Sequence, residues 1–523
     1  MGIGTRTRDR EWLLAQEEGA LPKEHRGRLR VALCYANTYH VGMSSLGLQT
    51  VYHLFNSIPD VVCERAFYPE DGRQKGPIRT LESGTPLGEF DLVAFSLSFE
   101  LDAARLVRML IRSGIPARAA ERTDRDPIVL VGGAVPTYNP EPMALIADAC
   151  AVGEAEEMVP EIAAATGSRG RRATLDGLAQ LEGLYIAHNY DLRYGDKEST
   201  AEISGPRVVA RHTADLDSFP THTRVFTRHS EFGHMFLLET ARGCGRGCRF
   251  CVADHAFRPA RRRSLPSLLA SAEGGLQKRR IVGLVAPSVT DHRQIDELCE
   301  GIMGLGGKIS IASVRADSIS ETVLRALAAS GARTITMAPE AGTQRLRDVI
   351  GKRISEADYL RAAQRAASLG IRRLKLYFMV GLPTETDDDV ASVAELVRRI
   401  RAEAGLEQVT VACAALVPKP KTPWEREAMQ PVRETRRKLQ MVRDALAGER
   451  WVRFAFESAR SSFIQAALSR GDRRLGEVLI RVSETAGATS DWLAAFRSCG
   501  MDAEALALRA RAPGEPLPWD LIR

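Results

Sequence analysis

Long apolar runs are missing from this sequence. None of its 523 residues belongs to a run long and apolar enough to cross a bilayer, and the first residues, MGIGTRTRDREW, lack the apolar stretch of a secretory signal. The net charge is also small, at +6, and arginine is spread along the chain, so the composition does not establish nucleic-acid binding. These absences predict a cytoplasmic protein with no membrane partner.

Cysteine is scarce, and its number is odd. Nine cysteines in a chain of this length argue against a disulfide framework. Most are scattered, but three lie within eight residues, at Cys244, Cys248 and Cys251. This clustering indicates that the three thiols share one inorganic centre.

The first part of the chain alternates short apolar runs with helical patterns. Residues 1–27 are charged and lack a clear periodicity, so we expect a mobile arm or one that lies on the surface. Residues 28–165 predict a doubly wound parallel sheet, with strands at 29–34, 61–67, 90–97, 127–131 and 149–152. Residues 166–232 are interpreted as a connector with some β-structure.

A second alternating series occupies residues 233–430. Its predicted strands are 235–239, 281–285, 309–313, 334–337, 373–378 and 408–413. Six βα units in series predict a partial (β/α)6 barrel of the TIM type, partly open rather than closed like a barrel of eight units. Residues 431–523 predict a small helical region without strands, with helices at about 432–447 and 473–486. The fold class is therefore α/β.

The cysteine loop directly follows the first barrel strand. Active sites of such barrels form at the carboxyl ends of the strands, so the loop is placed where a barrel enzyme performs its chemistry. Thiolates are soft ligands, which select iron–sulfur clusters, zinc or copper(I). Glycines within the loop allow a tight fold around such a centre. Arg242 and Arg246 are expected to offset the charge of the thiolates.

Three cysteines leave one iron of a four-iron cluster without a protein ligand, and such an open position suits catalysis. The alternative is a closed zinc site, because His255 lies four residues after Cys251 and could complete a set of four ligands. A non-catalytic zinc-binding regulator would use that site. A structural zinc site has no need to lie on the first strand of a barrel, so the position favours the catalytic interpretation.

The segment RGCGRGCRFC resembles the cluster loop of the radical S-adenosylmethionine (SAM) superfamily, including the aromatic Phe250 before the third cysteine. The resemblance implies that Cys244, Cys248 and Cys251 hold a 4Fe–4S cluster and that SAM binds to its open iron. Reductive cleavage of SAM then gives methionine and a 5′-deoxyadenosyl radical. An electron donor such as flavodoxin or ferredoxin is implied as a partner.

The same resemblance implies SAM contacts at the ends of the later barrel strands. They are Ala286 and Ser288 after the second strand, Ser313 and Arg315 after the third, Glu340 after the fourth, and Gly381 and Pro383 after the fifth. The second-strand segment departs from the Gly-Gly-Glu motif of the superfamily. Glycine and proline commonly end strands, so each match alone is weak, whereas their order on successive strands is specific.

A narrower resemblance covers nearly the whole chain. The blocks NTYHVGMSSLGLQTVYHLFN, VGGAVPTYNPEP, VGEAEE, APEAGTQRLRDVIGK and PKPKTPW resemble radical SAM proteins that carry a cobalamin-binding-like domain ahead of the barrel. In such a domain Gly132, Gly133 and Gly153 would line a cofactor crevice. The Asp-x-His-x-x-Gly signature that supplies a histidine ligand to cobalt is absent, because Thr38 precedes His40 where an Asp is required. Cobalamin could bind without a ligand from the protein, or the crevice could take substrate.

Two features keep an RNA-modifying enzyme as an alternative. Methylthiotransferases, another radical SAM group, carry a second cluster on three N-terminal cysteines, and Cys34, Cys63 and Cys150 could supply one here. However, Cys34 and Cys150 fall in predicted strands, where buried cysteine is common. The basic run at 258–263 could contact phosphate, but a solvated loop is the favoured interpretation.

The leading hypothesis is an enzyme that cleaves SAM to functionalise an unactivated carbon, with cobalamin-dependent methyl transfer as one form of the reaction. The sequence leaves open whether the substrate is a small molecule, a peptide or RNA.

Overall fold

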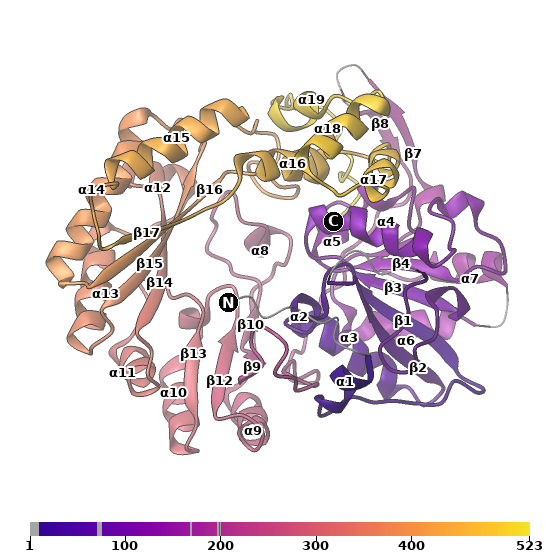
Figure 1. Ribbon diagram of the computed structural model, residues 1–523, viewed down its shortest axis with the longest axis horizontal. Coiled ribbons are helices and arrows are strands. Elements are labelled where there is room, and N and C mark those ends of the chain that lie inside the picture. Colours follow the sequence, from indigo (N-terminus) through magenta and orange to yellow (C-terminus); the bar gives the residue numbers. More distant parts are fainter. Residues whose placement is uncertain (1–9, 71–75, 168–169, 196–197, 199) are drawn as a thin grey trace.

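The computed structural model describes residues 10–70, 76–167, 170–195, 198 and 200–523. Figure 1 shows three regions: an N-terminal sheet on the right, an arc of barrel strands on the left, and C-terminal helices that extend across the top of both. Among the residues described, no helix is long and apolar enough to span a membrane.

The N-terminal sheet has the strand order β2-β1-β3-β4-β5-β6, with β6 antiparallel to β5 and the other neighbours parallel. The strands are β1 (Leu29–Tyr35), β2 (Val61–Phe67), β3 (Leu92–Ser96), β4 (Ile128–Gly132), β5 (Ala149–Ala151) and β6 (Leu184–Tyr185). All five predicted strands are confirmed. β6 lies in the predicted connector and is too short to give a periodic signal.

Helices cover both faces of this sheet, which is why its strands are mostly apolar. α3 (Leu46–Ser57) and α6 (Ala155–Ala165) pack on one face, and α4 (Ala103–Arg112) packs on the other. The chain changes winding direction between β1 and β3. Ligands of doubly wound sheets bind at the carboxyl ends of strands beside such a switch point.

The N-terminal arm is anchored by a buried ion pair. After α1 (Arg10–Ala15), the carboxylate of Glu17 lies 2.6 Å from Nη2 of Arg65, and both side chains are almost completely buried. The hydroxyl of Tyr39 donates to the same carboxylate at 2.6 Å. Residues 10–27 therefore lie on the surface of the sheet domain with a fixed attachment, whereas residues 1–9 lie outside the described part.

The barrel strands follow one another in parallel order. They are β9 (Met235–Glu239), β12 (Ile281–Val285), β13 (Lys308–Ile311), β14 (Thr334–Glu340), β15 (Arg373–Val380), β16 (Gln408–Ala415) and β17 (Val452–Phe456). The amide of Val314 donates to the carbonyl of Thr336 at 2.9 Å and joins the β13 segment to β14. The six predicted strands are confirmed.

The prediction that strands stop after residue 431 is wrong. β17 follows α15 (Val432–Ala445) and pairs in parallel with β16. It lies at the edge of the arc, and none of its residues is fully buried. An edge strand of this kind lacks the continuous apolar run by which the other strands were found.

The C-terminal helices connect the barrel to the N-terminal domain. They are α16 (Ala459–Arg470), α17 (Leu475–Ser483), α18 (Thr489–Ser498) and α19 (Ala503–Leu508), and α17 packs on α4. The indole of Trp519 is buried and donates to Glu425 at 2.7 Å, and the Arg523 amide donates to the carbonyl of Val208 at 2.7 Å.

Candidate functional site

The cysteine loop is closed at its base by two short strands. β10 (Ala241–Arg242) pairs antiparallel with β11 (Arg261–Arg262), and residues 243–260 between them carry Cys244, Cys248 and Cys251. The loop starts at the carboxyl end of β9, the position predicted for it.

A buried carboxylate shapes the interior of the loop. Asp254, on α8 (Val252–His255), is 1% exposed and accepts hydrogen bonds from the amides of Gly245 and Gly247, each at 2.6 Å. Arg258 donates to the same carboxylate at 3.1 Å. Burial alone would raise the pKa of Asp254, but these hydrogen bonds outweigh it and hold the pKa below its usual value. Asp254 is therefore a charged acceptor for the turns between the cysteines, a role that the sequence pattern did not reveal.

The three thiols are free and at least half-buried. Burial raises the pKa of each, and that of Cys248 rises to about 11. In the described part of the chain, no three Cys, His, Asp or Glu side chains are arranged so that they could already hold a metal ion. Three soft donors within one glycine-rich loop fit an iron–sulfur cluster.

The fourth ligand of the zinc alternative is engaged elsewhere. Nε2 of His255 lies 3.1 Å from the backbone carbonyl of Cys248. The arginines of the loop also have partners that the sequence did not predict: Arg246 donates to Asp291 at 2.8 Å, and Arg242 donates to Glu239 at 2.9 Å. The expectation that these arginines offset the thiolates needs correction for Arg242, which carboxylates balance, whereas Arg246 interacts electrostatically with Cys244 as well as with Asp291.

Charged residues predicted to contact SAM are paired with other side chains. Arg315 forms an ion pair with Asp317 at 2.8 Å, and Glu340 forms one with Lys352 at 2.8 Å. Lys352 is 9% exposed, and its charge lowers the pKa of Cys248, against the larger effect of burial. No motif marked Lys352, which follows α12 (Gln344–Ile350) by two residues.

Of the remaining predicted SAM contacts, Phe250 lies in the cysteine loop and the others lie at the carboxyl ends of barrel strands. Phe250 packs with Leu346 and Ile350 in a small apolar cluster. Ser313 is exposed, Ser288 and Pro383 are half-buried, and the buried Gly381 has φ 84° and donates its amide to Glu385 at 2.7 Å. Their assignment to SAM stays a prediction.

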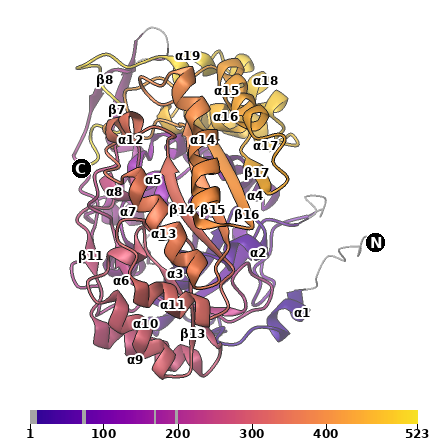
Figure 2. The same ribbon diagram turned by 90° about the vertical axis from the view of Figure 1, so that its left-hand side faces the viewer.

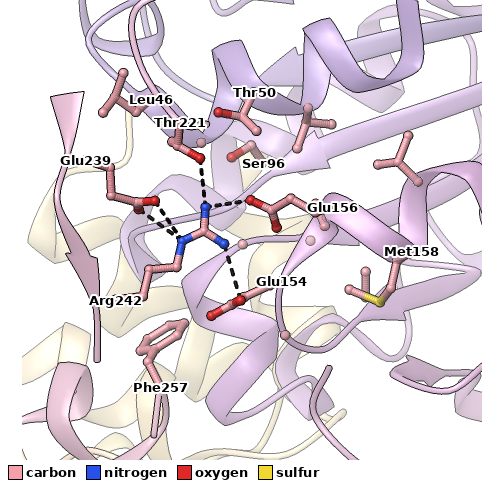
Figure 3. Close-up of a pocket in the computed structure, with 18 of the residues that line it drawn as sticks. Leu46, Thr50, Ser96, Glu154, Glu156, Met158, Thr221, Glu239, Arg242 and Phe257 are labelled. Carbon is pink, nitrogen blue, oxygen red and sulfur yellow. Dashed lines mark hydrogen bonds and ion pairs between the residues drawn. The ribbon is translucent and has the colours of Figure 1, made fainter. Parts of the chain in front are cut away.

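A cavity of about 480 Å³ joins the N-terminal sheet to the cysteine loop (Figure 3). This volume lies within the range typical of small-molecule sites. One end lies between the sheet and the two helices α3 and α6, and its apolar lining includes Leu46, Val51, Phe55, Leu130, Met158, Val159 and Ile162. The other end is lined by Gly243 and Phe257 of the cysteine loop and by Val285, Ala286 and Pro287 at the end of β12.

The three predicted crevice glycines all line this cavity. For Gly133 and Gly153, contacts within the chain itself explain why the residue is glycine. A Cβ at Gly153 would lie 2.3 Å from the carbonyl oxygen of Arg211, and one at Gly133 would lie 2.7 Å from that of Leu97. Both also have positive φ angles, of 111° and 108°. The chain itself therefore requires glycine at these positions, whereas a Cβ at Gly132 would meet only ordinary contacts.

Oγ1 of Thr50, a residue that lines the cavity, is buried, and none of the described residues hydrogen-bonds to it (Figure 3). His40 does not line the cavity: it is exposed and lies 3.2 Å from Glu231. A cofactor here would therefore receive no ligand from His40.

The cysteines suggested for a second cluster lie on three different strands and on both faces of the sheet. Cys34 and Cys150 lie on one face, in β1 and β5, and Cys63 packs on the opposite face. Two strands separate β1 from β5, so about 14 Å lies between them. Burial raises the pKa of all three thiols. This arrangement is that of structural cysteines.

The basic run at 258–263 is only partly solvated. Arg261 donates to Glu154 at 2.5 Å and Arg263 donates to Glu239 at 2.7 Å, and Arg263 is 2% exposed. Arg262 is exposed. Two of the arginines are therefore internal ion-pair partners, which the charge pattern could not indicate.

Comparison with known proteins decides the family. Residues 238–397 match the radical SAM superfamily, and residues 47–187 match the family described as radical SAM proteins, N-terminal. An uncharacterized protein of Methanocaldococcus jannaschii is 30% identical over 451 residues, which cover 86% of this chain and 90% of that protein. The chain belongs to the radical SAM superfamily. It is a radical SAM enzyme, and the superfamily implies a 4Fe–4S cluster and SAM as its cofactors.

Solved structures agree in fold. The radical SAM methyltransferase TsrM from Kitasatospora setae, with tryptophan substrate and a SAM analogue bound, has a TM-score of 0.51 and 14% identity, covering 76% of this chain and 75% of that chain. TsrM with cobalamin and a [4Fe–4S] cluster bound has a TM-score of 0.50, again at 14% identity, covering 76% and 74%. At this identity the likeness shows a shared architecture of N-terminal sheet, partial barrel and C-terminal helices.

Proposed function

We propose that this enzyme transfers a methyl group from SAM to an unactivated carbon and that it uses cobalamin bound at the N-terminal cavity. The observation that carries the proposal is the cavity itself. It connects the carboxyl edge of the N-terminal sheet with the cysteine loop, so a cofactor bound there would lie beside the cluster. The fold shared with TsrM supports the same arrangement.

The residues present fit cobalamin in a specific way. The apolar end of the cavity, between α3, α6 and the sheet, suits the aromatic base at the end of the nucleotide tail of cobalamin, with the Thr50 hydroxyl as a hydrogen-bonding group. The cavity is too small for the whole cofactor, so the corrin ring would lie toward the cysteine loop. Cobalt would receive no histidine, because His40 lies outside the cavity.

The two ends of the cavity give the cluster and cobalamin separate roles in the proposed reaction. Cys244, Cys248 and Cys251 would hold the cluster, which when bound supplies the electron that cleaves SAM, and cobalamin supplies a carrier for the methyl group. Phe257 and Val285 line the junction with apolar surface, which would exclude water from reactive species. A flavodoxin or ferredoxin is the proposed electron donor. The substrate class stays open.

The test is anaerobic expression with a cobalamin supply, followed by assay of iron, sulfide and cobalamin in the purified protein. Thr50→Trp fills the apolar end of the cavity, and Ala164→Trp adds the same side chain at an exposed position of α6. We expect cobalamin to be lost in Thr50→Trp but retained in Ala164→Trp, with iron retained in both. A wild-type protein that cleaves SAM but retains no cobalamin would refute the methyl-transfer proposal and favour substrate as the occupant.

A further inference from the structure

A network of buried ion pairs attaches the base of the cysteine loop to the N-terminal domain (Figure 3). The guanidinium of Arg242 donates to Glu156 at 2.5 Å, to Glu239 at 2.9 Å and to the hydroxyl of Thr221 at 3.0 Å. The carboxylate of Glu154 lies 3.2 Å from it. Arg242 therefore contacts the end of β9, the connector and the start of α6 at the same time.

The opposite strand of the loop base is held by the same carboxylates. Arg261 donates to Glu154 at 2.5 and 2.8 Å, and Arg263 donates to Glu239 at 2.7 Å. Both strands that close the loop are thus bonded to Glu154 or Glu239. The carboxylates Glu154 and Glu156 belong to the N-terminal domain, far from the loop in sequence.

These ion pairs affect stability because both carboxylates of the N-terminal domain are buried. Glu154 is 8% exposed and Glu156 is 3% exposed. A buried carboxylate without its cation is strongly unfavourable, so removing one partner disturbs the others. The link from Arg242 to Cys244 is also stiff, because Gly243, with φ 68°, lies so close to Phe257 that an added Cβ would be 2.5 Å from its carbonyl oxygen.

We propose that Glu154 and Glu156 are positioning residues for the iron–sulfur loop: through Arg242 they fix the backbone leading to Cys244 and set the electrostatic potential at the cluster. The inference rests on the proposed role of the loop as the cluster site. The same three side chains line the cavity, so a bound cofactor and the cysteine loop share one wall.

Neighbouring residues on the same helix provide a matched control. Glu157 and Glu161 of α6 pair with Arg211 of the connector, and no hydrogen bond or ion pair joins either of them to the described residues of the cysteine loop. A general effect of α6 charge or domain docking would appear in Glu157→Gln as well as in Glu156→Gln. Only the second variant removes a contact to Arg242.

The first measurement uses the full-length protein without its cluster. The loop contains Arg246 and Arg249, at which trypsin can cut, and both are exposed. The third arginine of the loop, Arg258, precedes Pro259 and is not a trypsin site. We expect Glu154→Gln and Glu156→Gln to be cut within the loop several-fold faster than the wild type, and Glu157→Gln to be cut at the wild-type rate. Equal cleavage of all four proteins would overturn the inference.

The second measurement is the midpoint potential of the reconstituted cluster, followed by electron paramagnetic resonance. Removing a carboxylate charge in Glu156→Gln should shift the potential to more positive values, and removing the cation in Arg242→Gln should shift it to more negative values. The double variant should fall between them, and Arg242→Lys should retain nearly the wild-type potential. Loss of stability alone cannot give shifts of opposite sign, so shifts of the same sign, or none, would refute the proposal.

The two measurements separate this inference from the proposed function. If the wild-type protein takes up no iron–sulfur cluster, the proposed function fails, while the proteolysis of the cluster-free protein still decides whether Glu154 and Glu156 hold the loop.

Discussion

Replacing Asp254 by Ala should release the interior of the cysteine loop. The carboxylate accepts two backbone hydrogen bonds of 2.6 Å, from Gly245 and Gly247, and one of 3.1 Å from Arg258. Hydrogen bonds to a charged group contribute about 1.5–3 kcal/mol each, so loss of the two backbone bonds alone destabilises the loop conformation by about 3–6 kcal/mol. That corresponds to a change on the order of 10² to 10⁴ in the population of the ordered loop.

The assay is retention of iron and sulfide by the reconstituted protein during challenge with a chelator. We expect Asp254→Ala to lose iron at least tenfold faster than the wild type. Asp254→Asn, which keeps the shape and one acceptor oxygen, should give an intermediate rate. The melting temperature of the whole protein should change little, because Ala256 is the one residue of the short loop that belongs to a large buried cluster of the barrel or sheet. Iron retention equal to that of the wild type in Asp254→Ala would refute this account of how the loop is held.

Three further predictions concern stability. Burial lowers the pKa of His222 to about 4, so the folded protein excludes a proton that the unfolded chain binds below about pH 6.5. The stability that His222 contributes is therefore fully present above about pH 6.5 and is lost as the pH falls through about 4. In His222→Gln the melting temperature should depend less on pH across this window. Trp519→Ala should cost about 3–5 kcal/mol in denaturant unfolding, because the indole is completely buried, and Trp519→Phe should cost less. Lys419→Met leaves the 3% exposed Glu100 without its cation and should cost about 3–5 kcal/mol, of which the double variant with Glu100→Leu recovers part.

The sequence predicted most strands because their signals are local. Each central strand is a short apolar run between helical patterns, and sheets covered on both faces require such runs. β17 was missed because an edge strand is only partly buried. β6 was missed because two residues carry no periodicity.

The candidate site also has features that local sequence reveals and features that it does not. The spacing of Cys244, Cys248 and Cys251 and the glycines between them lie within one loop, so the motif and its place after the first barrel strand could be found from the order of residues. Asp254 lies in the same loop but was overlooked, because an acidic residue at the start of a short helix has an ordinary role at a helix terminus.

By itself the sequence determined the superfamily, the order of the strands and the loop that would hold the cluster, since all of these depend on residues near one another in the chain. Only the tertiary structure decided that Arg242 meets Glu156, a residue 86 positions earlier, and that the sheet and the loop enclose a common cavity. A charged residue that becomes buried when domains dock needs an oppositely charged partner, but the sequence does not show which residue that partner is. The arginines near the cysteines therefore looked like partners for thiolates, and the folded chain pairs them with carboxylates.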